Sequence, residues 1–225
     1  MNRNDVSVLS RGRESALTTN KVLRNTYLLL GLTFLFSAFT AFTSFAVNAR
    51  PLNPLIFIVG VYGLMYLTSA LKESVWGLLA VFAFTGFLGY SLGPILNIYI
   101  KHFTNGPQII GTALGGTGLI FFALSGYVLT TRKDFSYLGG FLFVGMMIAF
   151  LAMIANIFLH IPALNLTVSA AIALISSGLI LFQTSEIIHG GETNYISATV
   201  SIFVSIYNLF LSLLQLLGAF AGNRD

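Results

Sequence analysis

The chain has 225 residues, of which 56% are hydrophobic and only 8% are charged, and its formal net charge is +4 at pH 7. A soluble domain usually carries about a quarter charged residues, so this chain has too few to cover a water-facing surface. Uncharged stretches of spanning length recur along almost the whole chain, which predicts an all-α, polytopic membrane protein embedded in the lipid bilayer. Strictly alternating segments of about ten residues, which a membrane β-barrel requires, do not occur.

The basic residues and the missing cysteines narrow the function classes further. Without cysteine the chain forms no disulfide and uses no thiol chemistry. Its basic residues do not indicate nucleic acid binding, because membrane topology accounts for where they stand. No His-Glu-x-x-His motif and no phosphate-binding glycine loop occur, and three scattered histidines predict neither a metal site nor a cofactor. The sequence therefore predicts no catalytic residue.

The first twenty-five residues are polar and basic, and we expect residues 1–25 to form a disordered cytoplasmic tail. This segment is not a cleaved signal peptide, because the apolar run after it is too long and lacks a small-residue cleavage site. The membrane bundle is predicted over residues 26–220, and residues 221–225 form a short C-terminal tail.

Seven apolar segments follow the tail, separated by turns that contain proline, glycine or charged residues. The predicted spans are Thr26–Val47, Leu55–Leu71, Val75–Ile100, Gln108–Thr130, Tyr137–Phe158, Ala163–Ile187 and Ile196–Phe220. A six-span alternative needs either the run around Leu164–Ile187 or the final segment to be re-entrant, and it leaves both termini on one side.

The positions of Lys and Arg predict the orientation, because short cytoplasmic loops carry an excess of them. With the N-terminus in the cytoplasm and seven spans, eight of these residues fall inside and three outside. The inside set is Arg3, Arg11, Arg13, Lys21, Arg24, Lys72, Arg132 and Lys133, and the outside set is Arg50, Lys101 and Arg224. We therefore expect a cytoplasmic N-terminus and a C-terminus on the outer side of the membrane.

Small residues interrupt the third, fourth and fifth spans. Our main interpretation is close helix–helix packing, which small residues promote in membranes. The third span allows a second interpretation, because its segment Gly86–Asn97 contains three glycines and Pro94. A helix broken there would free backbone carbonyls to line a cavity or bind an ion.

The last two spans each carry a polar stripe. On the sixth span Ser169, Ser176 and Gln183 recur every seven residues, and Glu186 follows three residues later. Glu186 is the only acid predicted inside a span. It is either a functional intramembrane carboxylate or a hydrated group near the membrane surface, and the sequence favours neither.

The seventh span has no charged residue, but its polar residues fall on one helical face. These residues are Ser197, Ser201, Ser205, Asn208, Ser212 and Gln215. A polar face is costly against lipid, so this helix belongs inside the bundle, and the economical arrangement places the two stripes against each other. Gln183, Glu186, Ser205 and Asn208 make up the candidate polar binding site.

Five stretches resemble the Bax inhibitor family of seven-span membrane proteins, in its bacterial branch. They are Lys21–Tyr27, Phe84–Asn97, Tyr127–Asp134, Ile188–Tyr195 and Tyr207–Gln215. The resemblance implies a bundle whose last helix is central and surrounded by the other six. It also implies that Gln183 and Ser205 stand where the wider family, which is associated with calcium or proton leak, has two aspartates that form a pH-sensitive latch.

This chain departs from the family at the latch, because neither glutamine nor serine titrates. A carboxylate pair cannot share a proton there, and a calcium site would lack its anionic oxygens. Glu186 is the nearest substitute.

Two functions follow from the resemblance and the residues. The first is a modulator and slow substrate of FtsH, the membrane-anchored ATP-dependent protease, with the tail as its handle and no catalysis of its own. The alternative is a pH-sensitive cation leak, of calcium or protons, along the sixth and seventh helices.

Overall fold

The computed structural model describes residues 3–222, with side chains from 19 to 221, and within this part the chain consists of helices joined by short loops. These helices are α1 (Arg3–Ala46), α2 (Pro54–Leu71), α3 (Trp76–His102), α4 (Gly106–Thr131), α5 (Leu138–Leu159), α6 (Pro162–His189) and α7 (Tyr195–Gly222). The part of α1 that is apolar enough to span a membrane is Thr19–Ala46. All seven described helices can cross a membrane by length and composition, so the predicted all-α, seven-span architecture is confirmed.

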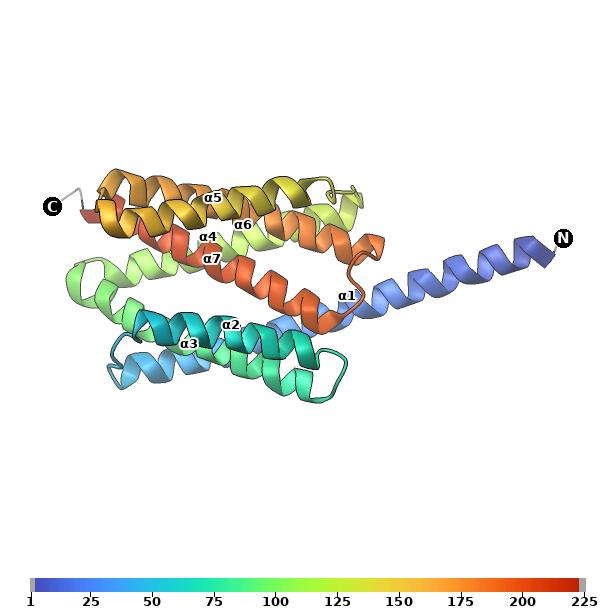
Figure 1. Cartoon of the computed structure of the whole chain (residues 1–225), viewed down its shortest axis with the longest axis horizontal. Helices are drawn as coiled ribbons and strands as arrows, with labels where there is room; N and C mark the ends of the chain where they lie inside the picture. Colours follow the sequence, from blue (N-terminus) through green and yellow to red (C-terminus); the bar gives the residue numbers. More distant parts are fainter. Residues whose placement is uncertain (1–2, 223–225) are drawn as a thin grey trace.

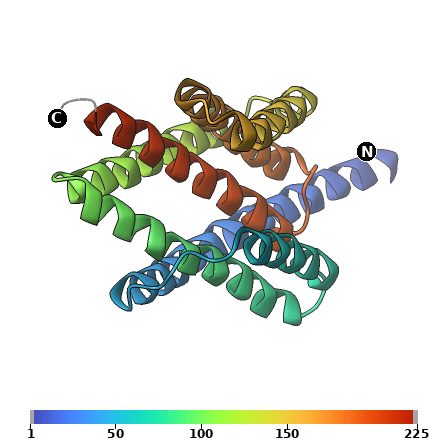
Figure 2. The same cartoon turned by 60° about the vertical axis from the view of Figure 1, so that its left-hand side comes forward.

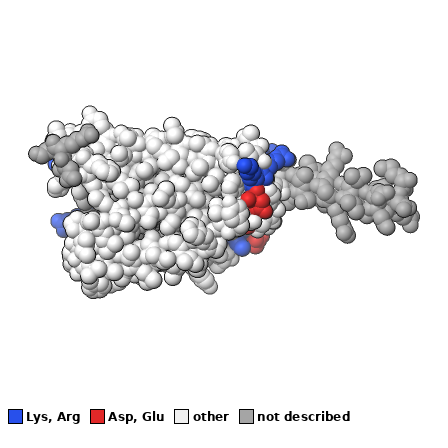
Figure 3. All heavy atoms as spheres, turned by 90° about the horizontal axis from the view of Figure 1, so that it is seen from above, with Lys and Arg blue, Asp and Glu red and all other residues white. Residues whose placement is uncertain are grey.

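The helices run alternately up and down, so the described ends of the chain lie at opposite ends of the bundle (Figure 1). Charged side chains gather at the two ends, and the sides in view between them are uncharged (Figure 3). This distribution is the one expected when the sides face hydrocarbon and the ends face water. The chain is therefore a multi-pass membrane protein.

Helix α1 begins at Arg3, well before the span, and its first turns project beyond the bundle (Figure 1). The helix boundary thus lies before the predicted boundary between tail and span at residue 26. The disorder that we expected for residues 1–25 stays a prediction.

Proline and left-handed residues set several helix boundaries. Asn53 accepts a hydrogen bond from the backbone N–H of Leu55 at 2.9 Å and caps α2, whose first residue is Pro54. Proline suits this position because its missing N–H would have no partner in the first turn. At the other end, α6 terminates at Gly190, whose φ of 79° is the left-handed conformation that glycine adopts without strain.

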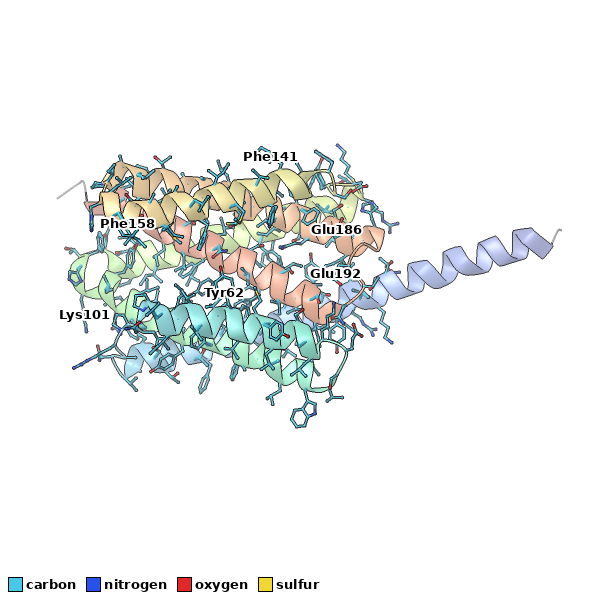
Figure 4. The ribbon with its side chains drawn as sticks, viewed as in Figure 1. Tyr62, Lys101, Phe141, Phe158, Glu186 and Glu192 are labelled. Carbon is cyan, nitrogen blue, oxygen red and sulfur yellow. The ribbon has the colours of Figure 1, made fainter. Side chains whose placement is uncertain are left out.

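Helix α7 crosses the middle of the bundle (Figure 2) and packs against α1, α2, α3, α4 and α6. Its central position agrees with the family resemblance, but it does not touch all six other helices. Helix α5 contacts only α6 and lies at the outside of the bundle. Its Phe141 and Phe158 point outward (Figure 4) and are 75% and 78% exposed, as lipid-facing side chains would be.

Helix α3 is unbroken from Trp76 to His102 and passes through the buried Pro94, so the alternative of a broken third span is wrong. Its glycines instead let α1 approach. A Cβ added to Gly89 would overlap the backbone oxygen of Ser37, and one added to Gly93 would overlap the side chain of Ser44. Asn97 extends this contact by donating to the carbonyl of Phe45 at 3.1 Å.

Candidate functional site

The polar stripes of α6 and α7 face each other along one seam. Ser205 Oγ on α7 donates to Gln183 Oε1 on α6 at 3.0 Å. Farther along, Ser169 Oγ on α6 donates to Gln215 Oε1 on α7 at 2.6 Å. The two contacts pair residues that share a helical face in sequence, so the prediction that the stripes meet is confirmed.

Between these pairs the seam contains a hydroxyl without a partner. Ser176 is fully buried, and its Oγ has no hydrogen-bond partner within the described chain. Most buried polar groups in folded proteins are paired. Ser176 is therefore the least satisfied point of the α6–α7 seam.

The other two residues of the predicted site do not join the Gln183–Ser205 pair. Glu186 lies in the last turn of α6, half-buried, and its carboxylate is so close to the loop that a Cβ added to Gly191 would overlap it. Figure 4 places Glu186 at the same end of the bundle as Glu192. Asn208 is half-buried on α7, and its side chain makes no hydrogen bond to any described residue. Their predicted role in binding stays a prediction.

A second polar cluster ties the α4–α5 loop to the end of α6. Ser185 Oγ accepts from the backbone N–H of Phe135 at 2.9 Å. His189 Nδ1 lies 2.9 Å from the carbonyl oxygen of Ser185, and His189 Nε2 lies 3.2 Å from that of Arg132. Both carbonyls are acceptors, and a neutral imidazole has a single N–H, so the tautomer decides which of the two receives a hydrogen bond.

Asp134 in the same loop has a pKa below its ordinary value. Hydrogen bonds from the backbone and side chain of Ser136 to its carboxylate are the main causes, and the nearby His189 adds a smaller effect. Each of these interactions favours the charged form of the acid.

The loop before α7 is held by Asn194, which sequence reasoning missed. Its Oδ1 accepts from the backbone N–H of Ile196 at 2.9 Å and of Ser197 at 3.1 Å, which caps α7. Its Nδ2 donates to the carbonyl of Lys72 at 3.1 Å and to Glu73 Oε1 at 3.0 Å in the α2–α3 loop. An asparagine directly before a long apolar run is a helix-start signal, and that signal was available.

The chemistry of the seam follows from its groups. Gln183 and Ser205, the two residues that we expected at the latch positions, form a neutral hydrogen bond, so no proton is exchanged between them. Across the described residues, no group of three or more metal-binding side chains is close enough to hold an ion. The two side-chain hydrogen bonds of the seam join α6 to α7.

Comparison with known proteins finds one matching family and several relatives of similar sequence. The family model for inhibitors of apoptosis-promoting Bax1 matches residues 19–222. The chain is 56% identical over 209 residues to the Escherichia coli K12 protein called modulator of FtsH protease YccA, covering 93% of this chain and 94% of that one. It is also 51% identical to an uncharacterized protein of Pseudomonas aeruginosa, with 90% of each chain covered. An uncharacterized membrane protein of Vibrio cholerae is 44% identical, with 93% of this chain and 94% of that one covered.

Proposed function

The chain belongs to the family of inhibitors of apoptosis-promoting Bax1, and from that premise we propose that it modulates the FtsH protease and is slowly degraded by it. The observation that carries the proposal is the 56% identity, over nearly the full length of both chains, to a protein named for that role. In this proposal the protein has no catalytic activity of its own and acts by contact with the protease in the bacterial inner membrane.

The N-terminal end of α1 supports the proposal physically. The helix projects beyond the other helices, so a partner at that membrane surface reaches it without disturbing the bundle (Figure 1). Lys72, Arg132 and Lys133 lie in the loops at the same end of the bundle. The excess of basic residues at this end favours the cytoplasm for it, with the C-terminus in the periplasm.

Removal of residues 2–18 tests whether FtsH engages the protein by its N-terminal tail. The deletion leaves the whole span Thr19–Ala46. We expect the shortened protein to persist several-fold longer than the full chain in cells that contain FtsH, and both to persist equally in cells without it. Pulse-chase measurement of half-life gives the answer. Removal of residues 223–225 is the control and should change nothing. Turnover that is independent of FtsH would sink the substrate half of the proposal.

The modulating role needs a separate measurement, because a substrate need not be a regulator. Raising the amount of the full chain should slow the degradation of a second membrane substrate of FtsH, and the chain without residues 2–18 should slow it less. If the half-life of the second substrate is the same at every level of this protein, modulation is refuted even if the protein is itself degraded.

A further inference from the structure

A crevice of about 540 Å³ runs between α1 and α4, and it does not belong to the polar seam. The backbones of α1 and α4 stay apart along the described chain, and their side chains meet where the rings of Tyr27 and Phe121 stack with centroids 6.1 Å apart. Helices α3 and α7 form the floor between them. Phe42 on α1 and Leu114 and Phe122 on α4 line the crevice and are 66%, 56% and 72% exposed. The mouth of this α1–α4 crevice therefore opens sideways, toward the hydrocarbon of the membrane.

The crevice offers almost no free polar group to an occupant. Thr117 Oγ1 donates to the carbonyl of Ala113 in its own helix at 2.7 Å. The hydroxyl of Tyr207 lies 2.9 Å from Ser91 Oγ. Ser37 is the other polar side chain of the lining, and the remaining residues are aliphatic, aromatic or glycine. An apolar ligand therefore fits this surface and a polar one does not.

The length of the crevice matches one leaflet. Phe34 and Phe45 mark its extent on α1 and are eleven residues apart, which is about 16 Å at ~1.5 Å per residue. Half of a hydrocarbon core of about 30 Å is ~15 Å. Phe45, Ile100 and Ile110 lie near the helix ends on one side of the bundle, so the crevice runs from that surface to the middle of the membrane.

The volume selects the kind of occupant. A helix with side chains is about 10 Å across, so 16 Å of it would need roughly 1,250 Å³, more than twice the space present. A hydrocarbon chain has a diameter near the carbon–carbon contact distance of about 4 Å, and the two chains of one lipid need on the order of 400 Å³ over the same length. The crevice therefore encloses the chains of one lipid, whereas a helix would project from its open side.

The charge at the mouth selects the headgroup. Lys101 follows the lining residue Ile100, and its ammonium donates to Asn48 Oδ1 at 2.9 Å just beyond the end of α1. Arg50 lies in the same α1–α2 loop and is exposed. The acids whose side chains are described, Glu73, Asp134, Glu186 and Glu192, all lie at the opposite end. Figure 4 shows Lys101 far from Glu186 and Glu192. An anionic group at Lys101 thus meets attraction, with no opposing acid among the side chains that the structure describes.

We propose that the α1–α4 crevice binds one anionic phospholipid, with its acyl chains between α1 and α4 and its phosphate at Lys101. This is a structural lipid site in the leaflet on the side where α1 ends. If the N-terminus is cytoplasmic, that leaflet is the periplasmic one.

Gly118 provides the test of the acyl site, because it lines the crevice and a Cβ there meets no atom within 4 Å. Gly118→Leu adds bulk to the crevice, and its Cβ meets no neighbour. Gly126→Leu is the matched control, since Gly126 is also on α4, also has nothing within 4 Å and does not line the crevice. The protein is purified in detergent, and native mass spectrometry follows its titration with phosphatidylglycerol.

We expect the full chain and Gly126→Leu to retain one lipid, and Gly118→Leu to bind it at least tenfold more weakly. Equal binding by all three proteins overturns the proposal. A phosphatidylglycerol with a photoreactive group in its acyl chain should label the lining residues of α1 or α4. Labelling spread evenly over the outer faces of α2 and α5 also overturns it.

Lys101→Gln and Lys101→Arg separate the headgroup from the chains. The full chain and Lys101→Arg should prefer phosphatidylglycerol over phosphatidylcholine of the same acyl composition by several-fold. Lys101→Gln should lose this preference and still bind lipid more tightly than Gly118→Leu does. A preference that survives in Lys101→Gln overturns the assignment of the phosphate to this residue.

Discussion

The contact between α1 and α3 is made by backbone brought close together, whereas the contact between α6 and α7 is made by polar side chains that reach across. These are the two most extensive helix pairs in the bundle. Gly89 and Gly93 remove side chains so that α1 lies directly on α3, and close van der Waals packing holds the pair. Gln183 and Ser205 hold the second pair by a neutral hydrogen bond. The α1–α3 contact should tolerate no added atom. The α6–α7 contact should lose only a little stability when a polar group is removed.

The largest effect should come from adding bulk to the α1–α3 contact. Gly89→Leu pushes against the backbone of Ser37, which cannot rotate away, so α1 must separate from α3 at a cost of about 3 kcal/mol. The loss of stability is measured by heating the protein in detergent and following its unfolding by size-exclusion chromatography. Gly115→Leu is the matched control because nothing lies within 4 Å of its added Cβ, and its effect should stay within about 0.5 kcal/mol. Equal destabilisation by both variants would show that the α1–α3 contact is not specially tight.

The second largest effect should come from the start of α7, at one end of its contact with α6. Asn194→Ala removes the cap of α7 and should cost about 1 kcal/mol, seen as faster hydrogen exchange in the first turn of α7. Asn105→Ala serves as the control, since Asn105 precedes α4 without a side-chain capping bond and should have a much smaller effect. If hydrogen exchange in the first turn of α7 is equally fast in the two variants, the capping bond contributes nothing to the stability of α7.

The seam itself should show a smaller coupling. A double-mutant cycle with Gln183→Leu and Ser205→Ala should give a coupling energy of about 0.6 kcal/mol, the average for hydrogen bonds between membrane helices. The cycle that pairs Gln183→Leu with Asn208→Ala should give none, because Asn208 makes no side-chain hydrogen bond to a described residue. A coupling well above ~2 kcal/mol would mean that the seam resembles the α1–α3 contact in strength.

The smallest effect is the pH response of the α4–α5 loop beside the seam. The pKa of Asp134 is lowered in the folded protein. The stability that this carboxylate gives to the folded loop is therefore fully present above the ordinary pKa of 3.8, and it is lost as the pH falls through the lowered value. Hydrogen exchange of the loop should therefore increase only in strong acid. Asp134→Asn should abolish this dependence, and an unchanged acid response in that variant would assign it to another group.

Much of the fold was predictable because each span carries its own signal. The predicted segment Leu55–Leu71 and the observed Pro54–Leu71 differ by one residue, since proline and charge mark both ends. The predicted first span, Thr26–Val47, begins later than the spanning part of α1, Thr19–Ala46, because the residues before Thr26 are polar and show no apolar periodicity. Local pattern predicts where a helix crosses the membrane, and not how far it continues outside.

The site was predictable only where a helical period aligned side chains. Gln183 and Ser205 were found in this way, because each stands on a stripe that must avoid lipid. The partners of His189 were not, because a backbone carbonyl such as that of Arg132 is present at every residue and leaves no mark in the sequence. Gly89 and Gly115 are likewise the same residue type within apolar spans, and only the neighbouring helix distinguishes their roles.

The unbroken course of α1 makes the bundle directional under mechanical load. A pull on the N-terminal end passes along one rigid helix axis into the span, with no hinge to absorb it. The first resistance comes from the α1–α3 contact, where a gap of about 1 Å already removes up to half of the packing attraction. Extraction from this end would therefore yield abruptly, with α1 leaving as a unit and exposing α7 to lipid in a single event.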